Sequence, residues 1–254
     1  IYGKDDKNVY VISKSTKFDE TYSSKIIKNA DVNSFEVMKN SMYTKDKNNI
    51  YFTHSDVVQI KNVDKDSFTI GENGFSHDKN SVYFYGKKID GISPKSFKIV
   101  DLAVNSWKPV TFALLTDSKN LYKLIYEFDP ETYKLKNTKL VTVTNVKVDA
   151  PSFEIVKEDT GSYYRDKDSV FYYDINKNEL RKVEGSNSKS FVEMDNFFAK
   201  DNKNVYYLGK QIRNISSEGF KFVGPDIAKN KNGVYFLKDK TGEGDYEIVP
   251  LNFD

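Results

Sequence analysis

The chain has 254 residues, no cysteine, two histidines and a formal net charge of +2 from 39 basic and 37 acidic side chains. Disulfides, thiol nucleophiles and Cys-ligated metal sites are therefore excluded, and three arginines among balanced charges argue against a nucleic-acid groove. No apolar run approaches the roughly 18 residues of a membrane-spanning helix, so no membrane-spanning segment is predicted.

Two short phrases alternate along the chain. The first is Lys-Asp-Lys-Asn or a close relative, followed by a branched apolar residue and one or two aromatics. Its seven copies occupy residues 4–10, 45–52, 77–84, 116–122, 165–172, 200–207 and 229–236. The second phrase, Ser-Phe or Gly-Phe at the start of a short strand, has six copies at 34–37, 67–70, 96–99, 152–155, 190–193 and 219–222. This self-similarity predicts a repeat protein.

Each repeat is predicted to be antiparallel β-structure. Asp and Asn favour a turn, and the Val-Tyr pair that follows them favours a strand. A second tight hairpin is expected on Gly-Lys at residues 86–87 and 209–210, followed by a short strand, a link and the Ser-Phe strand. Alternation along the Val-Tyr-Tyr strands predicts that one ring of each pair packs inside. Three or four strands every 29 to 49 residues is the size of a propeller blade.

The predicted fold is one all-β domain over residues 1–254, with about seven units of three to four strands. We expect a closed β-propeller, in which Ile1 and the segment near Leu251 would lie in one blade. The alternative is an open β-solenoid or superhelical array of the same units, whose edge strands would need capping.

Residues 101–150 form an irregular, insertion-like segment. A long hairpin is predicted around residues 129–131, and the segment holds Trp107, the only tryptophan. Excursions from a repeat scaffold often carry specificity, and large aromatics gain contact area at small entropic cost. Trp107, Tyr126 and Tyr133 are therefore the predicted partner-binding residues. The alternative is a long hairpin with no binding role.

The interlocked phrases resemble the DKNYY family of bacterial repeat proteins. Residues 75–100 and 197–223 carry the pattern most fully, whereas 112–156 and 229–253 depart from it. The resemblance implies an exported protein, periplasmic or at the cell surface, with a lipid anchor on a removed N-terminal segment as one form. It supplies no catalytic residues. The chain starts at Ile1 without a signal sequence and is interpreted as a mature or trimmed segment; the lack of cysteine fits the cytoplasm equally well.

The acid-rich segments have two interpretations, metal binding and simple turn chemistry. Residues 166–168 and 239–245 alternate acidic side chains as calcium loops do, but Asp and Asn also initiate turns by bonding their own backbone. Neither His54 nor His77 has a recognisable catalytic partner, and each is expected at the surface. No catalytic residue, metal site or cofactor is predicted.

Two classes of function remain open from the sequence. The first is a non-catalytic binding module of a bacterial exported or surface protein, recognising a protein or glycan partner. The second is an enzyme, a glycoside hydrolase-like protein that uses two carboxylates. A toxin-neutralising (immunity) partner is a binding role that the sequence does not separate from the first. The uniform repeats favour the first class, and the oligomeric state is not predicted.

Overall fold

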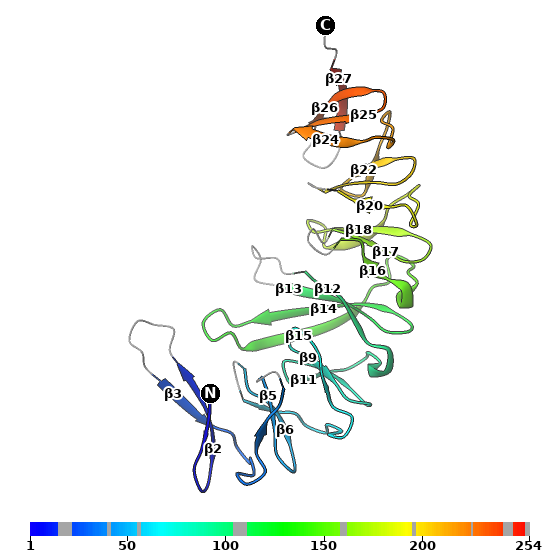
Figure 1. Cartoon of the computed structure of the whole chain (residues 1–254). Coiled ribbons are helices and arrows are strands. Elements are labelled where there is room, and N and C mark those ends of the chain that lie inside the picture. The colour runs from blue at the N-terminus through cyan, green and yellow to red at the C-terminus, as the bar shows by residue number, and fades with distance from the viewer. Residues whose placement is uncertain are drawn as a thin grey trace. The chain divides into compact units, whose positions relative to one another are not determined.

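The computed structural model describes residues 1–14, 22–39, 42–54, 57–103, 111–157, 162–194, 197–224, 226–240 and 246–251. These residues form seven antiparallel sheets, and every sheet consists of strands that follow one another in the chain (Figure 1). The only helical elements among them are two 3-10 turns, η1 (Pro94–Ser96) and η2 (Ala150–Ser152). The prediction of an all-β repeat protein with three- and four-stranded units is confirmed.

The first three sheets are short meanders. Sheet A contains β1 (Tyr2–Lys4), β2 (Val9–Lys14) and β3 (Tyr22–Ile26). Sheet B contains β4 (Glu36–Val37), β5 (Tyr43–Lys45), β6 (Ile50–Phe52) and β7 (Val58–Gln59). Sheet C contains β8 (Thr69–Ile70), β9 (Phe75–His77), β10 (Val82–Phe84) and β11 (Lys87–Ile89).

The other four sheets repeat the same strand order. Sheet D contains β12 (Lys98–Ala103), β13 (Thr111–Thr116), β14 (Leu121–Phe128) and β15 (Leu135–Thr142). Sheet E contains β16 (Glu154–Ile155), β17 (Tyr163–Arg165), β18 (Val170–Asp174) and β19 (Glu179–Lys182). Sheet F contains β20 (Val192–Glu193), β21 (Phe198–Lys200), β22 (Val205–Tyr207) and β23 (Lys210–Ile212). Sheet G contains β24 (Lys221–Gly224), β25 (Ile227–Asn230), β26 (Gly233–Asp239) and β27 (Tyr246–Leu251).

The boundary of the repeat differs from the sequence interpretation. The Ser-Phe strand begins a sheet instead of ending one: Thr69 of β8 pairs with His77 of β9, the next strand along the chain. The link before β8 explains this placement, because the Asp64 N–H donates to Asp78 in the turn that follows β9. The link is thus held to its own sheet by the Asp turn.

The tight hairpins turn one residue earlier than predicted. In sheet C the two central residues are Tyr85 (φ 48°) and Gly86 (φ 74°), and both lie in the left-handed region that a type I′ turn requires. A Cβ on Gly86 would lie 2.6 Å from the Cβ of Phe52, so this glycine permits close approach to sheet B. Leu208 and Gly209 form the same turn in sheet F.

In sheets B and C both rings of the central strand are buried, whereas alternation predicted that one ring of each pair packs inside. Tyr51 and Phe52 are fully buried, as are Tyr83 and Phe84. The reason is that consecutive sheets pack on opposite faces of each central strand. Tyr51 packs with Val9 of sheet A, whereas Phe52 packs with residues of sheets B and C.

The predicted long hairpin is confirmed, and the segment around it follows the repeat. Residues 98–142 contain sheet D, whose strands β14 and β15 are neighbours with eight residues each. At their turn the Asp129 N–H donates to the Lys134 carbonyl at 2.8 Å. The irregularity in the sequence therefore reflects longer strands on the same four-stranded plan.

The chain divides into two compact units. The first consists of residues 1–97, 105–112 and 124–140, and the second of residues 98–104, 113–123 and 141–254. Sheets A to C belong to the first unit and sheets E to G to the second. Closure into a ring and the single-domain assignment stay predictions.

Candidate functional site

Of the three predicted contact residues, the two that the structure describes differ sharply in exposure. Trp107 lies outside the described residues. Tyr126 is 6% exposed and packs between Phe84 and Phe128, with ring centroids 4.9 and 5.6 Å away. Tyr133 is 71% exposed in the β14–β15 turn, at φ 53°. Tyr126 is thus a core residue here, and the binding role of this segment stays a prediction.

The Asp-rich turns are built around one buried carboxylate, seen clearly in sheet C. Asp78 Oδ1 accepts the N–H groups of Asn80 and Ser81, both at 2.7 Å. Asp78 Oδ2 accepts the Asp64 N–H at 2.7 Å and the Tyr83 hydroxyl at 2.9 Å. One carboxylate therefore shapes the turn, ties down the link and holds the tyrosine of the central strand.

The same arrangement recurs in other sheets. The hydroxyls of Tyr51, Tyr122 and Tyr206 donate to Asp46, Asp117 and Asp201. Burial raises the pKa of Asp78, but the hydrogen bonds that it accepts outweigh burial and the net pKa is lowered. The interpretation of these acids as turn residues is confirmed for the described turns, including residues 166–168, whereas residues 241–245 of the other acidic segment lie outside the described residues. Among the described residues no three His, Asp or Glu side chains are grouped so as to hold a metal ion.

A second carboxylate in the link explains the serine of the Ser-Phe phrase. Asp64 accepts the N–H and the hydroxyl of Ser67 and forms an ion pair with Lys79 at 2.6 Å. Ser67 Oγ in turn accepts the Lys79 N–H at 3.0 Å. The hydrogen bond from Lys79 and those from Ser67 lower the pKa of Asp64 to about 2.

Sheet E departs from this arrangement at one position. Phe171 stands where the other six copies of the phrase have tyrosine, five residues after the first acid or amide of the turn. Asp166 keeps its turn bonds from Asp168 and Ser169 N–H, and its Oδ2 accepts the Asp149 N–H at 2.8 Å. With no hydroxyl on Phe171, that oxygen accepts one hydrogen bond from the described residues, where Asp78 Oδ2 accepts two.

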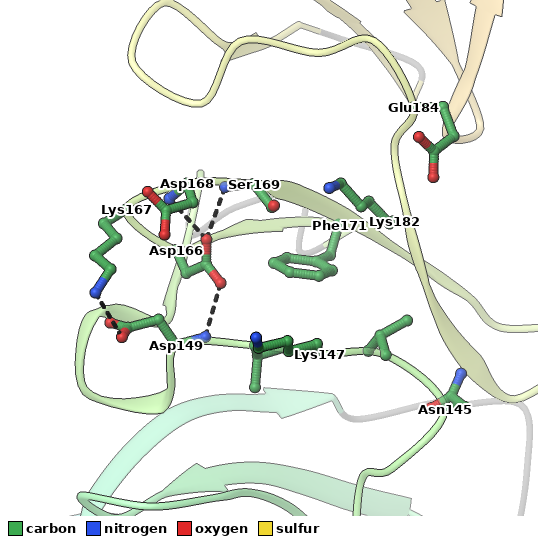
Figure 2. Close-up of a pocket in the computed structure, with 12 residues that line it drawn as sticks. Asn145, Lys147, Asp149, Asp166, Lys167, Asp168, Ser169, Phe171, Lys182 and Glu184 are labelled. Carbon is green, nitrogen blue, oxygen red and sulfur yellow. Dashed lines mark hydrogen bonds and ion pairs between the residues drawn. The ribbon is translucent and has the colours of Figure 1, made fainter.

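A cavity of about 720 Å³ lies at this position (Figure 2). Asp166 and Phe171 form its floor, and the link residues 145–149 form one wall. The exposed side chains of Lys147, Lys182 and Glu184 surround the opening. Figure 2 shows the Phe171 ring directed toward the Asp166 carboxylate, and Lys167 paired with Asp149, at 2.9 Å.

A comparable cavity of about 690 Å³ in sheets A and B shows which hydrogen bonds are lost when phenylalanine replaces tyrosine. There the Gln59 amide donates to Asn49, Asn49 donates to the Tyr51 hydroxyl, and Tyr51 donates to Asp46. In sheet E the positions of Gln59, Asn49 and Tyr51 are occupied by Lys182, Ser169 and Phe171. The internal polar relay is absent from these positions, and the buried carboxylate retains acceptor capacity toward the cavity.

Sequence reasoning missed this site although its signal was visible. In the sequence, one phenylalanine among seven copies of the phrase looks like ordinary aromatic variation. Its significance emerges only from the structure, in which the equivalent Tyr83 hydroxyl donates to the Asp78 carboxylate. The two histidines do not contribute: His54 is exposed, and His77 is half-buried in β9.

No helix in the described part of the chain has the length and apolar character of a membrane span.

Comparison with known proteins gives one clear result. No curated protein and no solved structure matches the chain. The model of the DKNYY family matches residues 2–177 and 175–239, which include six of the seven sheets in full and most of the last. The resemblance seen in the two phrases is confirmed over nearly the whole length, and the chain belongs to the DKNYY family.

Proposed function

We propose that the chain is a non-catalytic binding module of a bacterial exported or surface protein that recognises a protein or glycan partner. The cavity of sheet E is the proposed binding site. One observation carries this proposal: Asp166, 5% exposed, accepts one hydrogen bond on the oxygen that accepts two in sheet C. A partner hydroxyl or N–H that reached this oxygen would restore the second bond.

The charges around the cavity support binding rather than bond cleavage. The Asp166 Oδ1 atom is held by two backbone N–H groups, so the carboxylate is oriented by the turn. Lys147 and Lys182 supply cations at the opening, and Asp168 and Glu184 supply anions. A polar, mixed-charge rim over an aromatic floor suits a hydroxyl-rich glycan or a polar protein segment.

The location outside the cell is proposed from the family resemblance. A location outside the cell predicts that the binding partners belong to the cell envelope or to the surroundings of the cell.

The test exchanges a single hydroxyl. Purified chain is used to capture partners from the native host, and to probe an array of neutral and acidic oligosaccharides. Phe171→Tyr should weaken capture at least about tenfold, because one hydrogen bond to a charged group contributes roughly 1.5–3 kcal/mol. Tyr83→Phe, the reverse exchange in sheet C, is the matched control and should leave capture at sheet E unchanged.

The outcome distinguishes the two candidate binding regions. Capture that survives Phe171→Tyr in a folded protein would refute the cavity as the binding site. If the same capture is lost in Trp107→Ala with no change in melting temperature, the binding site lies within residues 101–150.

A further inference from the structure

The two faces of a sheet carry different residues, and where sheets are in contact each face packs on a particular neighbour. In sheets B, C, F and G the face toward the preceding sheet presents the first aromatic of the phrase beside a small residue, as in the Tyr206–Ala199 pair of sheet F. In sheet E the partner is the larger Tyr164. In sheets B, C, E and F the face toward the following sheet presents the second aromatic beside another large residue, as in the Tyr207–Phe198 pair. We call these the tyrosine face and the aromatic face.

The contact between sheets F and G shows how the two faces fit. Phe198 and Tyr207 on the aromatic face of sheet F pack in one cluster with Ala228, Tyr235 and Leu237 on the tyrosine face of sheet G. Phe198 is 4% exposed and Leu237 is 2% exposed. The small residue beside the tyrosine makes room for the large pair opposite, as close packing requires. The fit is therefore directional.

Sheet G has an aromatic face that no described residue covers. Phe236 pairs across the strands with Ile227 and Val249 and forms an apolar row over β25, β26 and β27. Phe236 is 38% exposed, whereas the equivalent Phe52 is 1% exposed. An uncovered face of a repeat is normally polar, because an apolar one promotes association.

Sheet A has the complementary tyrosine face, which none of the residues that the structure describes covers. Val9 of sheet A packs toward sheet B with Tyr51, so Tyr10, the next residue in the strand, faces the other way. Tyr10 pairs with the small residue Gly3 on one side and with Ile26 on the other, and Ile26 is 49% exposed. Gly3 corresponds to Ala228 and Tyr10 to Tyr235 in the sheet F–sheet G contact.

We propose that the aromatic face of sheet G binds the tyrosine face of sheet A from a second copy of the chain. The two faces have the residue pattern of the two sides of the contacts that already join consecutive sheets, so the association continues an interface type present in the chain. Because the two sides differ, the contact is heterologous, and copies associate head to tail.

The experiment measures mass by light scattering during gel filtration, over a wide range of concentration. The chain should form species larger than a monomer as its concentration rises. Phe236→Lys destroys one side and Ile26→Lys the other, so each variant alone should stay monomeric, with association weakened at least about tenfold. Ile175→Lys, at another exposed apolar residue outside both faces, is the control and should associate like the parent.

Mixing Phe236→Lys with Ile26→Lys gives the most discriminating experiment. Each retains one intact side, so an equimolar mixture should form one-to-one dimers and nothing larger. A parent chain that is monomeric at every concentration overturns the proposal, whether its faces stay open or close within one molecule. Failure of the mixture to form dimers also overturns it. The milder pair Phe236→Thr and Ile26→Thr replaces the lysine variants if melting curves show that these do not fold.

Discussion

Sheets C and E have the same backbone hydrogen bonds to the turn carboxylate and differ in one hydroxyl group that reaches it. Both have serine three residues after the first aspartate, both have lysine opposite the central aromatic, and both tie the link to the turn carboxylate. Sheet C adds the Tyr83 hydroxyl, and sheet E has Phe171 instead. Because sheet E keeps its four strands, the backbone bonds to the carboxylate are sufficient to build the sheet, and the tyrosine bond is an addition that one repeat can lose.

Removing the carboxylate itself is the largest test of this comparison. Asp78→Ala leaves the N–H groups of Asn80, Ser81 and Asp64 and the Tyr83 hydroxyl without their acceptor. We expect a loss of about 3–4 kcal/mol in the free energy of unfolding, measured by urea denaturation. Asp166→Ala removes three bonds instead of four and should cost about 1 kcal/mol less. Equal losses would mean that the Tyr83 bond contributes nothing to stability.

The local chemistry of these turns was predictable from the sequence. Asp and Asn followed by Val-Tyr indicated the hairpins because the carboxylate bonds backbone two and three residues onward, which is a local interaction. The burial of both Tyr51 and Phe52 was not predictable from alternation, because the second face is covered by a neighbouring sheet. The start of each sheet at the Ser-Phe strand was missed for a related reason, since a link bond to a later turn sets it.

The candidate site was even less visible in the sequence. Tyr126 was chosen for its size, but the register of β14 places its ring against Phe84 of sheet C. Phe171 is visible in the sequence of the phrase. Its role, however, follows only from the hydrogen bond that the Tyr83 hydroxyl donates to Asp78 in sheet C. A site that is created by the absence of one hydroxyl group can be recognised only when the positions of the neighbouring side chains are known.

The side chain that reaches sheet E from sheet D provides the second test. Lys123 occupies the position that Phe84 has in sheet C, is buried, and donates to Tyr173 and Asn178 of sheet E. Burial lowers its pKa from 10.5 to about 8. The folded state thus disfavours the charged form, and between about pH 8 and 10.5 the unfolded state binds more protons. Stability should therefore rise with pH in this window.

Lys123→Met should remove that rise. Tyr173 still donates to Asn178 at 2.7 Å, so the variant leaves this pair bonded and should be within about 1 kcal/mol of the parent at neutral pH. Unfolding free energies at pH 7 and about 8.5 check this, because unfolded tyrosines, with a pKa of about 10, remain almost fully protonated there. A rise of equal size in the variant would assign the effect to another group.

The ion pairs of the two links form the smallest test, because solvent screens exposed lysines. Hydrogen bonds from Lys79 and Ser67 lower the pKa of Asp64 from 3.8 to about 2, and bonds from Ser152 and Lys167 lower that of Asp149. A carboxyl whose pKa is lower in the folded state than in the unfolded state stabilises the fold at pH values above its unfolded pKa. This stabilisation is lost as the pH falls from about 4 toward 2. Asp64→Asn and Asp149→Asn should therefore lower the melting temperature slightly and equally at pH 6, and both differences should vanish near pH 2. A deficit that persists at pH 2 would show that the amide disturbs the Ser67 or Ser152 bonds. A larger effect in sheet E than in sheet C would show that the charges around the cavity act on its link.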